Sequence, residues 1–205
     1  MDIIDKNILV ALYVASLTNK NVNEILKKKI FLTDKAIEER LNNLQKNGLV
    51  EKDKKSLTEL GRTSLKVVLA GGVFDIIHPG HIHTLNSAKL LGDVLVVVVA
   101  TDKTAVKMKK RTPLHNQIHR QNLVNSLSMV DLTLIGHEDD IFKTVEMVKP
   151  EIVALGYDQI HQEKFITDGC RKLNLNVKVA RLQSPNPEIS SSKIEEEYGE
   201  HIHDI

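Results

Sequence analysis

Short apolar runs alternate with segments of helical periodicity from Lys66 to the end of the chain. The runs contain few polar residues, and they read KVVLAGG, DVLVVVVAT, LTLIG, EIVALG and NVKVARL. Strands that are apolar on both faces are typical of a parallel sheet that helices cover on both sides. Five such strands with helical crossovers predict a doubly wound, five-stranded parallel sheet in a Rossmann-like α/β domain over residues 66–205.

Ligands of doubly wound sheets bind beyond the carboxyl ends of the strands, at the point where the strand order reverses. Three segments of this chain directly follow predicted strands, and they are Gly71–Gly80, Ala100–Asp102 and Gly156–Asp158. Because the carboxyl ends of parallel strands meet at one end of a sheet, we expect these three segments to form the functional site together.

Residues 1–64 have a different pattern, with three predicted helices followed by a short strand and a charged turn. The third helix has Thr33 or Asp34 as its N-cap and stops at Gly48. Three helices and a small hairpin resemble a winged helix-turn-helix domain, which would imply DNA as a partner. Twelve basic and nine acidic side chains make this region only slightly positive, so weak DNA binding is expected at most. A packing or dimerisation role is the alternative.

The composition limits the kinds of partner that the chain can have. Hydrophobic residues make up 41% and charged residues 27%, and the formal net charge is +1, so any site for a polyanion must be local. One cysteine leaves no intramolecular disulfide and no cysteine-based metal cage. No apolar run is long enough to span a membrane, and a cytoplasmic location is expected.

Three histidines follow the first predicted strand closely, in the stretch GGVFDIIHPGHIHTL. Pro79 suits the first turn of a helix, so His78 and His81 would flank the helix N-terminus. Unpaired N–H groups attract phosphate there, and imidazoles can donate hydrogen bonds to it. A zinc site and a chance cluster are the alternatives, but no carboxylate nearby in the sequence completes a metal-ligand set. His83 falls on another helical face and has no assigned role.

The segment GGVFDIIHPGH resembles the GxFDxxHxGH signature of the cytidylyltransferase-like nucleotidylyltransferases, which are relatives of the class I aminoacyl-tRNA synthetases. The resemblance continues through residues 66–195. The further motifs are a strand with a basic loop, a helix with the family's arginine, a nucleotide-contacting loop and a serine motif. They read VVVVATDKTAVKMKKRTP, HRQNLVNSLSMVD, IVALGYDQ and ISSSKI. Five motifs in the right order indicate this superfamily.

The resemblance implies direct nucleotidyl transfer. A phosphomonoester oxygen would attack the α-phosphorus of a nucleoside triphosphate, and pyrophosphate would leave. That nucleophile is ionised near pH 7, so it needs no general base. Positioning and electrostatic stabilisation would carry catalysis, with Mg²⁺ bridging the phosphates and no metal site formed by the protein itself.

The family motifs also assign site residues. The catalytic residues would be His78, His81, Lys107 and Lys109. The nucleotide-binding residues would be Gly72, Val73, Phe74, Asp75, Gly80, Arg120, Gly156, Asp158, Ser190, Ser191 and Ser192. Plainer structural interpretations stand beside these. The basic loop can be a solvated charge run in which Lys103, Lys110 and Arg111 are only surface charges, and the serines and Asp158 can be helix caps.

Within the superfamily, the chain most resembles archaeal FAD synthases, which join AMP from ATP to FMN. The resemblance implies ATP and FMN as substrates and a homodimer. The alternative is a cytidylyltransferase that makes a CDP-alcohol from CTP and glycerol phosphate or a similar phosphomonoester, although Gln159 and the displaced Arg181 depart from that pattern. A transcription regulator that senses flavin or nucleotide without turnover is a third alternative.

Overall fold

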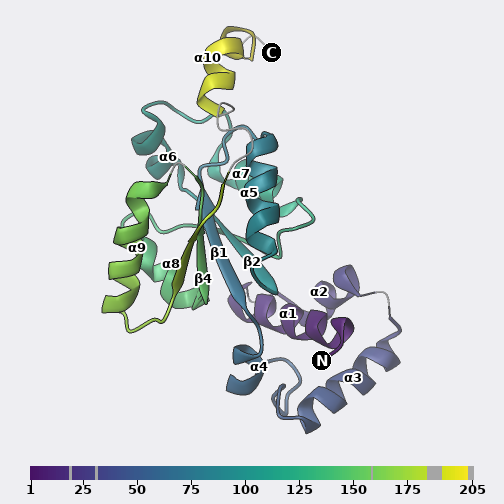
Figure 1. Cartoon of the computed structure of the whole chain (residues 1–205). Coiled ribbons are helices and arrows are strands. Elements are labelled where there is room, and N and C mark those ends of the chain that lie inside the picture. Colours follow the sequence, from purple (N-terminus) through teal and green to yellow (C-terminus); the bar gives the residue numbers. More distant parts are fainter. Residues whose placement is uncertain (19, 31, 158, 184–190, 203–205) are drawn as a thin grey trace. The chain divides into compact units, whose positions relative to one another are not determined.

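The structure is a computed structural model that describes residues 1–18, 20–30, 32–157, 159–183 and 191–202. The chain divides into two compact units, residues 1–66 and residues 67–205 (Figure 1). Within the described part of the chain, no helix combines the length and the apolar character that a membrane crossing requires.

The second unit is built on a five-stranded parallel sheet with the strand order β3-β2-β1-β4-β5. Its strands are β1 (Val67–Gly72), β2 (Val94–Val99), β3 (Leu132–Ile135), β4 (Ile152–Leu155) and β5 (Lys178–Arg181). β1 pairs with β2 on one side and with β4 on the other, so the strand order reverses between these neighbours. The predicted Rossmann-like, doubly wound α/β fold is confirmed.

Helices cover both faces of this sheet (Figure 1). α5 (Pro79–Lys89) and α7 (Gln117–Asn125) lie on one face, and α8 (Ile141–Val148) and α9 (Ile160–Lys172) lie on the other. α6 (Asp102–Lys109) follows β2, and α10 (Ser191–Ile202) lies near the end of the chain. Because all five strands are parallel, the segments that leave β1, β2 and β4 emerge at the same end of the sheet.

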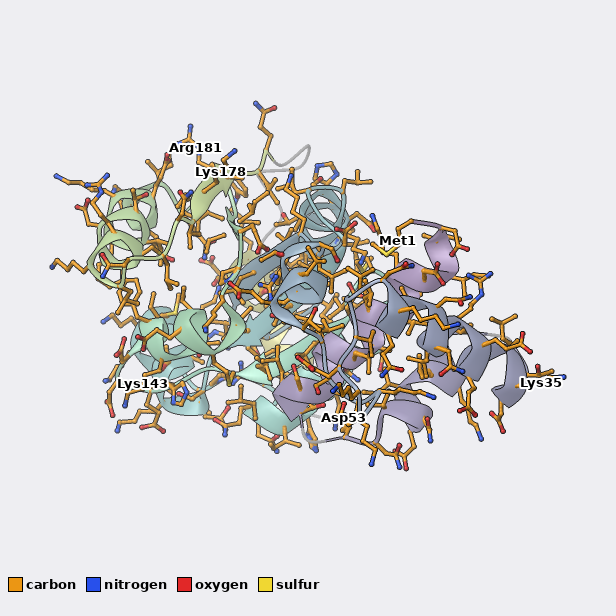
Figure 2. All side chains as sticks on the ribbon, turned by 90° about the horizontal axis from the view of Figure 1, so that it is seen from below. Met1, Lys35, Asp53, Lys143, Lys178 and Arg181 are labelled. Carbon is orange, nitrogen blue, oxygen red and sulfur yellow. The ribbon has the colours of Figure 1, made fainter. Side chains whose placement is uncertain are left out.

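The central strands are buried on both faces, which accounts for their unbroken apolar sequence. Val67, Val68, Val94 and Val96 have no exposed surface. The edge strand β5 differs, because Lys178 and Arg181 at its two ends are exposed (Figure 2). Charged side chains on an edge strand discourage pairing with a strand of another chain.

The basic segment after β2 is a helix and not the loop that the sequence suggested. Thr101 caps α6, since its Oγ1 accepts a hydrogen bond from the N–H of Thr104 at 3.1 Å. Lys110 takes a left-handed conformation with φ 61° and ends the helix. The lysines of this segment are therefore spread around a helix, and they cannot all point to one place.

The first unit contains α1 (Ile3–Thr18), α2 (Val22–Lys29), α3 (Asp34–Lys46) and the short α4 (Glu59–Thr63). An isolated antiparallel bridge pairs Val50 with Leu57. Thr33 is the N-cap of α3, because its hydroxyl accepts a hydrogen bond from the N–H of Ala36 at 3.3 Å. The winged helix-turn-helix assignment stays a prediction, since the described elements are helices and one isolated bridge rather than a full hairpin.

Two glycines shape the segment that joins α3 to α4. Gly48 takes φ +72° just after α3, a conformation that favours glycine at the end of a helix. Gly61 approaches the backbone of Leu49 so closely that a Cβ would lie 1.9 Å from the carbonyl oxygen. Any side chain at position 61 would therefore force α4 away from this segment.

Candidate active site

The histidine motif lies where β1 ends and the chain turns toward α5. β1 ends at Gly72, where a Cβ would lie 3.0 Å from the ring of Phe74. Phe74 has φ 54°, a backbone conformation that is uncommon for a bulky residue and often marks a functional site. The turn places His78 at the N-cap position of α5, with Pro79 in the first helical turn. The strand-to-helix junction thus has the form that the sequence predicts.

The rings of His78 and His81 lie against each other at the N-terminus of α5. Their centroids are 3.9 Å apart, and their planes are inclined by 33°. The ring of Phe74 lies 5.1 Å from that of His81, measured between centroids. Both Nδ1 atoms are buried and have no hydrogen-bond partner among the described residues. Unpartnered nitrogens beside a helix N-terminus are suited to an anionic ligand.

Burial favours the neutral form of both imidazoles. The pKa of His81 is lowered to about 4, chiefly by desolvation and also by the nearby charges of His78 and Lys109, while the backbone of Ile76 opposes the shift. Desolvation, followed by the charge of Lys109, also lowers the pKa of His78. A bound phosphate would act in the opposite direction, because a neighbouring negative charge favours the imidazolium form.

A cavity of about 170 Å³ lies beside the two histidines. Its lining comes from the end of β1 and the turn after it, from α5, from the end of α6, from the segment after β4 and from the start of α10. The predicted site residues that line it are Gly72, Val73, Phe74, His78, Gly80, His81, Lys109, Gly156 and Ser191. We call this cavity the histidine pocket.

Lys109 and the serine motif meet beside the histidine pocket. The Nζ of Lys109 lies 3.3 Å from the Oγ of Ser192. Ser191 is buried, and its hydroxyl donates a hydrogen bond to the carbonyl oxygen of Ile76 at 3.0 Å. This bond attaches the start of α10 to the turn that carries the histidines.

Several predicted site residues are not among those that line the pocket in the described part of the chain. Lys107 is exposed on α6 and does not line the pocket. Residues two positions apart on an α-helix point about 200° apart, so Lys107 and Lys109 face different directions. Asp158 and Ser190 lie outside the described residues.

Arg120 is fully buried and does not line the pocket. Its guanidinium donates hydrogen bonds to the carbonyl oxygens of Val73 and His115 at 2.6 and 2.9 Å. It also forms an ion pair with Asp102 at 2.7 Å. These bonds join α7 to the histidine turn and to the start of α6. The family's arginine therefore fixes the segments that form the site without lining the pocket itself.

Asp75 is also buried, with 1% of its surface exposed, and does not line the pocket. Its carboxylate accepts a hydrogen bond from the N–H of Leu114 at 2.8 Å and forms an ion pair with Arg111 at 2.8 Å. The interpretation of Arg111 as a surface charge is therefore wrong. Asp75 and Arg111 fix the segment after α6 against the histidine turn.

The structure adds lining residues that were not assigned to the site, among them Thr84, Met108, Tyr157 and Gln159. Thr84 follows His81 by three positions on α5, and that helical spacing was the signal that the sequence offered. The Oε1 of Gln159 accepts a hydrogen bond from the N–H of Gly156 at 2.7 Å, which fixes the turn after β4. The other two are brought in by tertiary packing.

Imidazoles, a lysine and helix N-termini surround the histidine pocket. Among the described residues, no group of three or more histidine, cysteine, aspartate or glutamate side chains is arranged to hold a metal ion. The zinc alternative for the histidines therefore has no ligand set in this part of the chain. Donors and positive charge of this kind suit phosphate chemistry.

A protein-family model described as cytidylyltransferase-like matches residues 69–197 of the chain. This segment is more than half of the chain. The chain belongs to the cytidylyltransferase-like family. The matched segment includes every residue that lines the histidine pocket, so the pocket belongs to the cytidylyltransferase-like part of the protein.

Curated relatives of this cytidylyltransferase-like chain include proteins named FAD synthase. The one from Picrophilus torridus is 51% identical over 125 residues, which are 61% of this chain and 89% of the relative. The one from Aciduliprofundum boonei is 52% identical over 116 residues, which are 57% of this chain and 77% of the relative. Most of each relative is matched, whereas about two fifths of this chain lies outside the match.

A solved structure also resembles the chain. It is titled lipopolysaccharide core biosynthesis protein from Thermoplasma volcanium and is 45% identical, with a TM-score of 0.56. The similarity covers 58% of this chain and 98% of that protein. Nearly all of that protein therefore corresponds to part of this chain, whereas about two fifths of this chain has no counterpart in it.

Proposed function

We infer that this protein is an FAD synthase, which transfers AMP from ATP to FMN and releases pyrophosphate. The observation that carries the inference is the identity of 51% and 52% with relatives named FAD synthase. The histidine pocket lies within the family segment and provides the donors and charge that nucleotidyl transfer requires.

The reaction needs positioning more than proton transfer. The terminal phosphate of FMN is the nucleophile, and it is ionised at neutral pH, so no residue has to deprotonate it. It attacks the α-phosphorus of ATP; a new oxygen–phosphorus bond forms, and the bond to the bridging oxygen of pyrophosphate breaks. The protein has to hold both phosphates in line and stabilise the charge that develops on their oxygens.

The described residues divide these tasks among them. His78 and His81 present unpartnered ring nitrogens at the N-terminus of α5, where they can bond to oxygens of the transferred phosphate. Lys109 supplies a positive charge to the same pocket. Ser192, at the start of α10, offers its hydroxyl to the leaving pyrophosphate, whereas the hydroxyl of Ser191 is donated to Ile76 and holds the start of α10 in place.

Mg²⁺ would enter this site with the triphosphate. The carboxylate of Asp75 is already bound to Arg111 and to the N–H of Leu114, so the donor set fits an ion held chiefly by phosphate oxygens. When bound, such an ion neutralises charge on the phosphates. A homodimer, a cytoplasmic location and a weak contact of the first unit with DNA stay predictions.

The test is product formation from purified protein with Mg²⁺ and either ATP or CTP, each with FMN or glycerol 3-phosphate. We expect FAD and pyrophosphate from ATP and FMN, separated by chromatography. The His81→Ala variant is the control for a contaminating enzyme, and it should form little product. Product from CTP with glycerol 3-phosphate alone would replace FAD synthesis with cytidylyl transfer, and flavin binding without any product would favour a sensor.

A further inference from the structure

A second cavity, of about 200 Å³, lies at the same end of the sheet as the histidine pocket. Most of its walls are apolar side chains from β2, β4, α8 and α9, among them Val98, Ile141, Val145, Leu155 and Ile166. Neither His78 nor His81 lines it. The phosphate chemistry described above therefore makes no use of this cavity, which we call the apolar pocket.

The apolar pocket and the histidine pocket adjoin each other. Five residues line both, and they are Ala70, Gly71, Gly72, Met108 and Gln159. Two of the five are glycines at the end of β1, so backbone without side chains separates the two cavities. A ligand with a ring in one cavity and a phosphate in the other would cross β1 at Gly71 and Gly72.

The apolar pocket contains a buried polar atom without a partner. Thr144 of α8 lines the cavity and is 3% exposed. Its Oγ1 has no hydrogen-bond partner among the described residues. Buried hydroxyl groups are usually hydrogen-bonded, so an exception that lines a cavity indicates a ligand atom as the missing partner. Gln159 and Gln162 add amide groups to the same lining.

We propose that the apolar pocket binds the isoalloxazine ring of FMN, with Thr144 as a hydrogen-bond partner of the ring. The proposal rests on the FAD synthase function proposed above. The ring is flat and tricyclic, with an apolar dimethylbenzene end and a pyrimidine end that carries carbonyl and N–H groups. That chemistry matches a largely apolar lining that also carries threonine hydroxyls, an imidazole and two amides, with the hydroxyl of Thr144 unpartnered among the described residues.

This placement also connects the ring with the reaction. With the ring in the apolar pocket, the ribityl chain passes Gly71 and Gly72 and brings the FMN phosphate to His78 and His81. ATP then occupies the histidine pocket, beside Gly156 and the start of α10. The opposite arrangement would place adenine in the apolar pocket, and the experiment distinguishes the two.

The test compares Thr144→Val with Thr133→Val. Thr133 is the matched control, because it is also buried, its Oγ1 also lacks a partner among the described residues, and it lines neither cavity. Binding of riboflavin and FMN is followed by flavin fluorescence without ATP, and KM is measured for FMN and for ATP. We expect Thr144→Val to weaken flavin binding and raise the KM for FMN about 3- to 10-fold, the effect of one hydrogen bond, without changing the KM for ATP. Thr133→Val should change none of these values.

A second variant tests the cavity itself. Val98 lies on β2 and contributes its side chain to the apolar pocket, so Val98→Phe should fill the space and reduce riboflavin affinity at least 10-fold. ATP binding, measured by calorimetry, should persist in this variant. Thermal unfolding shows whether each variant is folded. If Val98→Phe is not folded, the comparison of Thr144→Val with Thr133→Val tests the ring site alone.

The possible outcomes separate this proposal from the proposed function. Normal flavin binding in both Thr144→Val and a folded Val98→Phe variant would overturn the ring site even if the protein makes FAD. A raised KM for ATP with an unchanged KM for FMN would assign the pocket to adenine instead. Flavin binding that depends on Thr144 in a protein that makes no FAD would support the ring site and refute the synthase.

Discussion

Both units of this protein form ion pairs, but Lys109 of the second unit is placed differently from the paired basic side chains of the first. In the first unit, Arg40 forms ion pairs with Asp2 and Asp5 at 2.6 and 2.8 Å, and Lys54 pairs with Glu38 at 3.1 Å. In the second unit, Lys109 lines the histidine pocket, and no acidic partner for it occurs among the described residues. Desolvation lowers the pKa of both histidines most, and the charge of Lys109 adds to that shift.

The difference indicates where a polyanion can bind. Positive charge that an acid already neutralises contributes little to phosphate binding, whereas an uncompensated charge beside a helix N-terminus attracts it. The second unit keeps such a charge at Lys109, next to two half-buried histidines whose Nδ1 atoms are buried. We therefore assign nucleotide chemistry to the second unit, and each prediction below tests that contrast.

The largest effect is expected from His81→Ala. The variant loses a preorganised donor at the transferred phosphate, which typically lowers kcat about 100- to 1,000-fold. His83→Ala is the matched control, because His83 is exposed on the same helix and does not line the pocket. Steady-state kinetics of both variants, with thermal unfolding to confirm the fold, gives the comparison. Equal rates in the two variants would remove His81 from the mechanism.

The next prediction compares one arginine from each unit. Arg120→Met leaves the carbonyl oxygens of Val73 and His115 and the carboxylate of Asp102 without their donor, and we expect a loss of roughly 3 kcal/mol in unfolding free energy. Arg40→Met removes partly exposed ion pairs and should have a small effect. Denaturant unfolding of both variants measures the difference. An unchanged unfolding free energy in Arg120→Met would contradict the inference that Arg120 holds α7, the histidine turn and α6 together.

The sheet was predictable because its signal is local. The central strands are continuous apolar runs, and each is followed by a helical pattern, so the order and type of these elements could be inferred segment by segment. The histidine turn was predictable for the same reason, since Pro79 and the spacing of His78 and His81 act within one helical turn.

Other features depend on contacts between distant residues. Arg120 bonds to Val73 across 47 positions, and Asp75 bonds to Leu114 across 39, which no local pattern indicates. The apolar pocket combines residues from several strands and helices, so its lining could not be inferred from any one motif. The basic segment forms a helix with Thr101 as its N-cap, and the high charge of the segment had favoured the prediction of a loop.

A third prediction concerns pH. The pKa of His81 is lowered from an ordinary 6.5 to about 4, so below pH 6.5 the unfolded chain binds a proton that the folded protein resists. The free energy of unfolding therefore decreases as the pH is lowered. We expect His81 to account for a loss of about 2 kcal/mol between roughly pH 7.5 and pH 5. Urea unfolding at both pH values measures it, and His81→Ala should show a smaller loss. ATP should also reduce the loss, because its phosphates favour the imidazolium form.

A smaller effect is expected from removing the first unit. All residues that line the histidine pocket and the apolar pocket lie between Leu69 and Ser191. A chain that begins at Ser64 should therefore fold and keep kcat and KM for FMN within about twofold of the full chain. Circular dichroism confirms folding, and kinetics gives the comparison. Lost activity in a folded protein would show that the first unit contributes to the site.

The smallest effect is expected for DNA. On α3, Arg40 is paired with acids, Glu38 is paired with Lys54, and Lys35 extends into solvent beside Asp34 (Figure 2). Few phosphates could be neutralised by such a surface, so we expect dissociation constants no tighter than the nonspecific range of about 10⁻⁴–10⁻⁶ M, weakening with added salt. Fluorescence anisotropy with labelled duplexes at two salt concentrations measures this. Sequence-specific binding with a nanomolar dissociation constant would instead identify the first unit as a DNA-binding domain. The two units would then differ in the kind of polyanion that each one binds.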